Sequence, residues 1–297
     1  MSHPHLPPEI LYRVIDHLHD EPEALKGCCL ASKSCVPRTR KHLFANIRIR
    51  SAGDLESWLK TFPDVATSPA CHARTLFIGC LLLVVAADAK DGGWIQSFSG
   101  VTSLDVDNGD WHLRPSEVSL TPLYKFSSTL KSLRMCPIFL SFPQLFNLIR
   151  SLPLLEDLSL SGHDHGSFGL DDDPPGSQTV IPLASPSFTG FLDLNVLGGL
   201  GKIAHQLLES PNGLHFRKIA LSWDRPEDAR WITELVVGCS HTLESLDVAY
   251  DTHGTSIRIC TGTNNLILFS WDGVNLVRPL KSDKTTRRGS STPLADR

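Results

Sequence analysis

The sequence predicts an α/β protein in which a short unit of three helices precedes a solenoid of strand–loop–helix repeats. Three observations lead to this fold. An aliphatic–x–aliphatic phrase returns at near-even spacing from residue 46 onward. Stretches with helical apolar periodicity separate its copies, and residues 1–45 carry short apolar stripes of a different kind. The predicted domains are therefore residues 1–45, residues 46–275 and a disordered tail at 276–297.

The composition is that of an ordinary globular protein. Of 297 residues, 41% are hydrophobic and 20% are charged, so a sizeable core can form. No apolar run reaches the roughly 18 residues of a membrane span, and the N-terminus lacks a signal pattern. Eight cysteines occur without CxxC pairs, which favours a reducing compartment, the cytoplasm or the nucleus.

The charge is distributed unevenly along the chain. Residues 1–50 hold eight Lys or Arg and five Asp or Glu, a balance of +3. The remainder holds twenty and twenty-seven, a balance of −7. This is not the dense basic patch of a nucleic-acid-binding protein, so neither nucleic acid nor membrane is an expected partner.

The first helix is expected within residues 6–18, LPPEILYRVIDHL. Its apolar residues recur at spacings of three and four, and Pro7 and Pro8 suit a helix start. A second helical segment carries Leu25 and Leu30, and a third lies near residues 38–44. Three short helices bury too little surface to be stable alone. The unit therefore needs a neighbour, either the repeats behind it or another chain.

The repeat follows from the first aliphatic residue of each phrase. These residues are Ile47, Leu76, Leu104, Leu133, Leu158, Leu192, Ile219 and Leu246. Their spacings of 29, 28, 29, 25, 34, 27 and 27 residues lie in the range of long leucine-rich repeats. Helices are expected between the strands at residues 54–62, 142–152, 201–210 and 226–238. An ordinary α/β fold is the alternative.

Two segments break the regular pattern. Residues 163–178, HDHGSFGLDDDPPGSQ, lengthen one repeat and are rich in Gly, Asp and Pro, which predicts a surface insertion. After Leu246 no clear terminal cap follows. Either the strand-like LILFSW at 266–271 closes the stack, or the chain is a shortened form of a longer protein.

The N-terminal residues resemble a known motif. LPPEILYRVIDHL, then EALKGCCLASKSCVPRTRKHLF and NIRI, looks like an F-box, which docks onto the Skp adaptor of cullin–RING ubiquitin ligases. The resemblance covers roughly residues 5–45. An F-box followed by irregular leucine-rich repeats is common in F-box proteins of mushroom-forming fungi. The sequence departs from the family at Cys35, where a tryptophan is usual, and at Gly27-Cys28-Cys29, where leucines are more frequent.

The resemblance implies a substrate-receptor subunit of a Skp–cullin–F-box ubiquitin ligase, which is not itself an enzyme. The repeats would hold a client protein while the F-box meets the Skp adaptor. Residues implied to contact the adaptor, or to support those that do, are Leu6, Pro7, Ile10, Leu11, Ile15, Leu18, Leu25 and Leu30. The alternative is a leucine-rich interaction scaffold outside any ligase, whose F-box-like helices only cap the solenoid.

No motif nominates catalysis, a metal or a cofactor. His163, Asp164 and His165, with aspartates at 171–173, resemble loose metal ligands. A Gly/Pro-rich loop lacks the fixed geometry of a metal site, so a solvated loop is favoured over a hydrolase site. The glycines at 198–201 lack the spacing of a phosphate-binding loop and are interpreted as a turn.

The polar neighbours of the strand aliphatics are candidate client contacts. By strand alternation they face away from the core, on the concave surface. Acidic residues outnumber Arg134 and Lys218 there, and they are Asp105, Asp107, Asp157, Asp193 and Asp247. We expect aspartates of different repeats to lie in a ladder that prefers basic or amide-rich client segments. The alternative is that open strands simply carry solvated polar residues.

Overall fold

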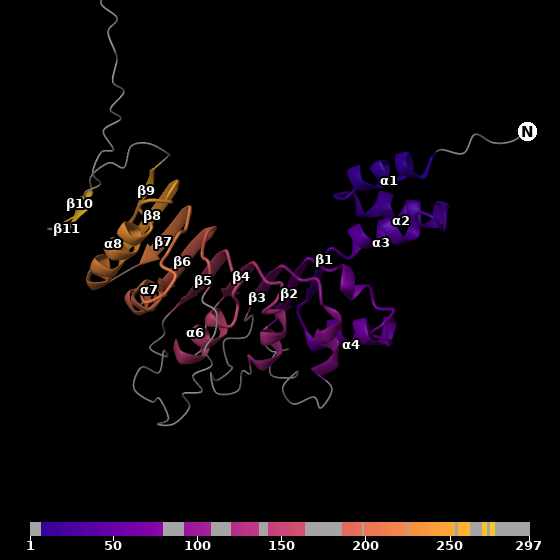
Figure 1. Ribbon diagram of the computed structural model, residues 1–297, viewed down its shortest axis with the longest axis horizontal. Helices are drawn as coiled ribbons and strands as arrows, with labels where there is room; N and C mark the ends of the chain where they lie inside the picture. The colour runs from indigo at the N-terminus through magenta and orange to yellow at the C-terminus, as the bar shows by residue number, and fades with distance from the viewer. Residues whose placement is uncertain are drawn as a thin grey trace, which may run out of the picture.

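The computed structural model describes residues 7–79, 92–107, 120–136, 142–163, 186–197, 199–223, 225–252, 255–261, 269–271 and 274–276. Within these residues the fold is α/β, with three N-terminal helices followed by a large sheet whose first eight strands are parallel. The helical unit extends from the β1 end of the sheet, and the longer helices lie along one face of it (Figure 1). The predicted insertion at 163–178, except for His163, lies outside the described residues, as does the tail after Leu276.

The helical unit consists of α1 (Pro8–His17), α2 (Pro22–Ala31) and α3 (Val36–Leu43). Each helix has a proline in its first turn, where a backbone N–H has no intrahelical partner to lose. Ile15, Leu25 and Cys35 form its buried centre, and Leu18, Cys28 and Leu43 pack around them. The predicted three helices are therefore confirmed, with Cys35 inside their small core.

The parallel strands lie side by side in sequence order. They are β1 (Asn46–Ile49), β2 (Thr75–Gly79), β3 (Ser103–Asp107), β4 (Ser132–Cys136), β5 (Asp157–His163), β6 (Phe191–Leu197), β7 (Lys218–Trp223) and β8 (Ser245–Thr252). The first aliphatic residues of all eight phrases are in register, from the pair Ile47–Leu76 to the pair Ile219–Leu246. The predicted strands and their equivalence are confirmed.

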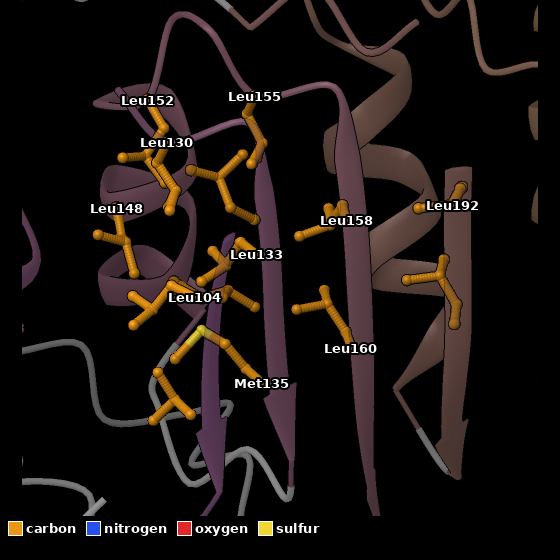
Figure 2. Packing of buried hydrophobic residues seen from close by; sticks show 14 of the residues in the cluster. Leu104, Leu130, Leu133, Met135, Leu148, Leu152, Leu155, Leu158, Leu160 and Leu192 are labelled. Carbon is orange, nitrogen blue, oxygen red and sulfur yellow. The ribbon is translucent and has the colours of Figure 1, made fainter. Parts of the chain in front are cut away.

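The inward aliphatic residues of β1 to β8 form one continuous core. It runs from Ile47 on β1 to Leu246 on β8, because each strand buries its inward residues against the next. Figure 2 shows leucines of neighbouring strands gathered beside a helix that contributes Leu148, with Leu152 just after it. The side chains of Leu148 and Leu152 are 0% exposed, as are those of Leu158 and Leu160. No strand could bury this surface alone, since every strand depends on its neighbours.

Helices and single turns connect the strands. They are α4 (Ala52–Thr61), η1 (Pro69–His72), η2 (Gly92–Ser97), η4 (Thr121–Phe126), α6 (Phe142–Arg150), α7 (Leu200–Leu208), η5 (Pro226–Asp228) and α8 (Ala229–Gly238). The four predicted helices are confirmed as α4, α6, α7 and α8. α4 begins with a capping box, in which Ser51 accepts from the Asp54 amide and Asp54 accepts from the Ser51 amide.

The start of each repeat is fixed by a row of backbone carbonyls. The carbonyl of Arg74 accepts the amides of Thr102 and Ser103, and the carbonyl of Thr102 accepts those of Lys131 and Ser132. The same fork recurs up to Arg217, whose carbonyl accepts the amides of Glu244 and Ser245. At the step from β5 to β6 the carbonyl of Glu156 accepts the amide of Gly190, and Asp157 Oδ1 accepts that of Phe191. These forks satisfy backbone groups that the connections would otherwise leave unpaired.

The C-terminal end differs from the expectation. β9 (Thr255–Thr261) extends the sheet beyond β8, and it runs antiparallel. Within the described residues the segment LILFSW does not join this sheet. Its end forms β10 (Phe269–Trp271), which pairs with β11 (Val274–Leu276) in a separate two-stranded sheet. The alternation of residues in β9 resembles that of the other strands and does not show its direction.

Candidate protein-interaction surfaces

The helical unit leaves apolar side chains uncovered on α1. Ile10 is 43% exposed and Val14 is 50% exposed, and their separation of four residues places them on one stripe. Pro7 at the start of this stripe is exposed and Leu11 is half-buried. Tyr12 is 40% exposed on the same helix. An apolar group of this size on so small a unit is typical of a surface that a partner covers.

The implied adaptor residues divide into two groups. Ile15 and Leu25 are buried at 2% and 1% exposure, and Leu18 is half-buried, so these three support the unit from inside. Pro7, Ile10 and Leu30 are exposed, Leu30 at 90%. Leu6 lies outside the described residues. Val14 was not among the residues predicted to contact the adaptor, although its spacing from Ile10 already placed it on the same stripe.

A polar clamp joins the first and third helices. Arg38 on α3 donates from Nε to Asp16 Oδ1 on α1 at 2.6 Å and from its terminal nitrogen to Oδ2. His42 Nε2 lies 2.8 Å from Asp16 Oδ1. The hydrogen bonds from Arg38, followed by those from His42, hold the pKa of Asp16 well below its ordinary value. The clamp holds α1 in place beside α3 and thereby orients the exposed stripe.

The helical unit meets the rest of the protein mainly through its third helix. α3 contacts η1, and two residues separate its end at Leu43 from the start of β1. The buried centre of the unit is a separate cluster from the core of the sheet. The unit therefore stands beside the end strand with its own small core, and the α1 stripe belongs to no core cluster of the described residues.

The expected ladder of aspartates does not form. Within the described pairings, each aspartate lies opposite a residue of another kind. Asp105 lies between Phe77 and Arg134, Asp107 between Gly79 and Cys136, Asp193 between Ser159 and Ala220, and Asp247 between Ala220 and Cys260. Asp157 lies opposite Ser132, which is two residues earlier along the strand than the position that Asp105 and Asp193 share. The prediction of stacked like charges is wrong, since the equivalent positions hold mixed residues.

Several of these aspartates have partners within the protein. Asp157 Oδ1 accepts the amide of Phe191 at 2.7 Å, and Asp193 Oδ2 accepts the hydroxyl of Ser159 at 2.9 Å. Burial raises the pKa of Asp105 above its ordinary value, an effect that nearby Arg134 opposes and Asp107 reinforces. All five aspartates are half-buried. Asp157 and Asp193 bind groups of the sheet itself, so less of their charge is available to a partner.

Nothing in the described chain supports a metal or phosphate site. No group of three His, Cys, Asp or Glu side chains in the described ranges could hold a metal ion. The histidine–aspartate loop lies outside those ranges after His163. Gly199 precedes α7 as its N-cap residue, and the amide of Gly201 donates to Asp228 Oδ1 at 3.1 Å. The helix start is thus occupied by a carboxylate of the protein. No described helix has both the length and the apolar character to cross a membrane.

Comparison with known proteins adds no relative. No family model, no curated protein and no solved structure matches this chain.

Proposed function

We propose that this chain is a substrate-receptor subunit of a Skp–cullin–F-box ubiquitin ligase. The single observation that carries the proposal is the exposed stripe of Ile10 and Val14 on a helical unit with its own small core. The same residues also resemble an F-box, which supports the proposal independently of their exposure. The members that reach the surface, Pro7, Ile10, Leu11, Val14 and Leu30, are the proposed contacts with the Skp adaptor.

The repeats in this proposal form a leucine-rich-repeat-like solenoid that carries the client. In-register strands in sequence order, with connections of near-even length, support it. The chain itself would carry out no bond chemistry. It would hold the client near the ubiquitin-charged enzyme and so raise its effective concentration, in the cytoplasm or the nucleus.

A second candidate is an interaction scaffold outside any ligase, with the helical unit as an N-terminal cap. The contact between α3 and η1 favours it, because a terminal cap must touch the first repeat. The two candidates differ in what covers the α1 stripe. A ligase subunit needs an adaptor there, whereas a cap leaves the stripe to solvent.

Charge substitution on the stripe distinguishes the two candidates. Ile10→Asp with Val14→Asp should abolish co-purification with a recombinant Skp adaptor, because a carboxylate buried in an apolar contact is strongly unfavourable. Val237→Asp on α8 is the matched control, since Val237 is 56% exposed and lies far along the chain. Circular dichroism should show all three proteins folded. Adaptor binding that survives the double substitution, or that the unaltered chain never shows, would sink the ligase proposal.

A further inference from the structure

The exposed face of the sheet carries cations as well as aspartates, at the β1 end. Arg48 alternates with the buried Ile47 and Ile49 on β1, so it projects to the exposed face, and Arg50 follows with the same alternation. Phe77 on β2 lies directly opposite Arg48 in the register. The guanidinium carbon of Arg50 is 5.9 Å from the centre of the Phe77 ring. We call Arg48, Arg50 and Phe77 the arginine patch.

Neither arginine of the patch has an ion pair within the described residues, in contrast to three cations further along the chain. Lys131 pairs with Glu156, Arg217 with Glu244 and Arg230 with Glu234. Neither Arg48 nor Arg50 has a carboxylate within ion-pair distance in the same part of the chain. Asp105, two strands from Arg48, feels its charge. Asp54 likewise feels the charge of Arg50. The patch therefore presents two exposed guanidinium groups that no ion pair of the described residues neutralises.

The geometry points to the arginine patch as a docking site for an acidic peptide segment, and we propose that the client protein supplies it. This inference rests on the proposed function, because it names the chemistry of the client. A guanidinium binds a carboxylate through two parallel hydrogen bonds. The Phe77 ring holds one guanidinium by a cation–π contact and offers an apolar surface beside it. The preference is opposite in sign to the one that the aspartates suggested.

The surroundings favour a peptide over a nucleic acid. Asp105 and Asp107 lie next along the sheet from the patch, and they would repel a continuous phosphodiester backbone. A peptide can place two carboxylates on the arginines and pass the aspartates with neutral residues. The patch also begins on the strand that directly follows α3. A client held there would lie on the end strand of the sheet, which is the strand nearest to the helical unit.

Binding of labelled probes to the full chain tests the inference. The probes are a decapeptide of alternating Glu and Gly, its Lys counterpart, a phosphoserine counterpart and a single-stranded DNA decamer, measured by fluorescence anisotropy at low salt. We expect the Glu peptide to bind about tenfold tighter than the Lys peptide, and added salt to weaken it. Substituting Arg48→Gln with Arg50→Gln should weaken the Glu peptide about tenfold. Arg217→Gln with Arg230→Gln, which removes paired cations, should change it by less than about twofold.

Each other result contradicts the proposal. Equal binding of the Glu peptide to the arginine-patch variant, or tighter binding of the Lys peptide, excludes this site. Tighter binding of the phosphoserine peptide replaces the carboxylate with phosphate as its ligand, and tighter binding of DNA excludes a protein partner. Co-purification with the Skp adaptor is measured on the same variants. If the chain binds the adaptor but not the Glu peptide, the proposed function stands and this inference fails. If it binds the Glu peptide but not the adaptor, the proposed function fails and the peptide site stands.

Discussion

The helical unit and the sheet are stabilised in different ways. The strands of the sheet share one core from Ile47 to Leu246, so each strand is covered by its neighbours. The helical unit has a core of Ile15, Leu25 and Cys35 within the described residues, and it adds the clamp between Asp16 and Arg38. A unit with so few buried side chains is marginal by itself. The sheet buries its apolar residues in its own core, whereas part of the apolar surface of the helical unit is left uncovered.

The largest expected effect separates the two cores. Leu158→Ala on β5 removes a side chain that is 0% exposed at the centre of the sheet, and the cavity should destabilise the sheet by about 2–5 kcal/mol. Ile15→Ala should instead unfold the helical unit while the sheet persists. All six tryptophans lie at positions 58 to 271, outside the unit. Thermal unfolding followed by tryptophan fluorescence therefore reports mainly the part of the chain that follows the helical unit.

Hydrogen exchange of residues 8–43 supplies the complementary measurement. Ile15→Ala should remove protection there without lowering the tryptophan-detected Tm. If both substitutions lowered that Tm equally, the two cores would be one cooperative unit, and the comparison between them would collapse.

A smaller effect concerns a contact that joins two repeats of the sheet. A Cβ at Gly190 would lie 2.0 Å from Asp157 Oδ1, the atom that accepts the Phe191 amide. Gly190→Ala should therefore destabilise the sheet by about 1–3 kcal/mol. Gly53→Ala on α4 is the control, because its Cβ would meet nothing closer than 3.8 Å. It should hold or raise stability, since alanine favours a helix.

The second substitution in this contact makes the test specific. In a chain that already carries Asp157→Ala, the carboxylate is gone, so Gly190→Ala should cost less than in the unaltered chain. Urea unfolding of the unaltered chain and its three variants gives the coupling energy, expected at about 1 kcal/mol. Additive effects would show that Asp157 and Gly190 do not meet, and would return Asp157 to the group of surface charges.

Features that depend on neighbouring residues in the sequence were predictable. Each strand carries its own alternation, and the phrase repeats, so the equivalence of Leu104 and Leu133 follows from the sequence alone. The helices α6 and α7 follow from apolar spacing in the same way. The apolar spacing of residues 6–18 also predicted which residues of α1 form its apolar stripe. It could not predict which of them the unit would bury, because that depends on how the three helices pack.

Features that depend on residues far apart in the sequence were missed. The partner of Asp157 lies 34 residues further along the chain, and the residue opposite Arg48 is Phe77 on the next strand. The positions of the aspartates in the sequence show their charge but not the side chains between them. The antiparallel β9 was missed for a related reason. Its alternating residues fit a strand of either direction, so they did not show that β9 would pair antiparallel with β8.

The smallest expected effect concerns the clamp of the helical unit. The pKa of Asp16 is lowered in the folded protein, first by its hydrogen bonds from Arg38 and then by His42. A lowered pKa means that the ion pair stabilises the folded unit above the unfolded carboxyl pKa of about 4, and that this stabilisation is lost as the pH falls toward the lower folded value. The pair is accessible to water, so salt should screen it.

Asp16→Asn removes this pH dependence and so tests the clamp directly. At neutral pH the variant should show weaker hydrogen-exchange protection in α1 and α3 than the unaltered chain, with an unchanged tryptophan-detected Tm. As the pH falls from about 4 toward the lower folded pKa, the two proteins should converge, because the unfolded carboxyl binds its proton first and the clamp then stabilises the folded unit less. Glu23→Gln is the control, since Glu23 pairs with Lys26 within α2 and joins no two helices. If the Asp16 variant kept the same acid sensitivity as the unaltered chain, other groups would hold α1 against α3. The exposed stripe would then be oriented by the three buried side chains alone.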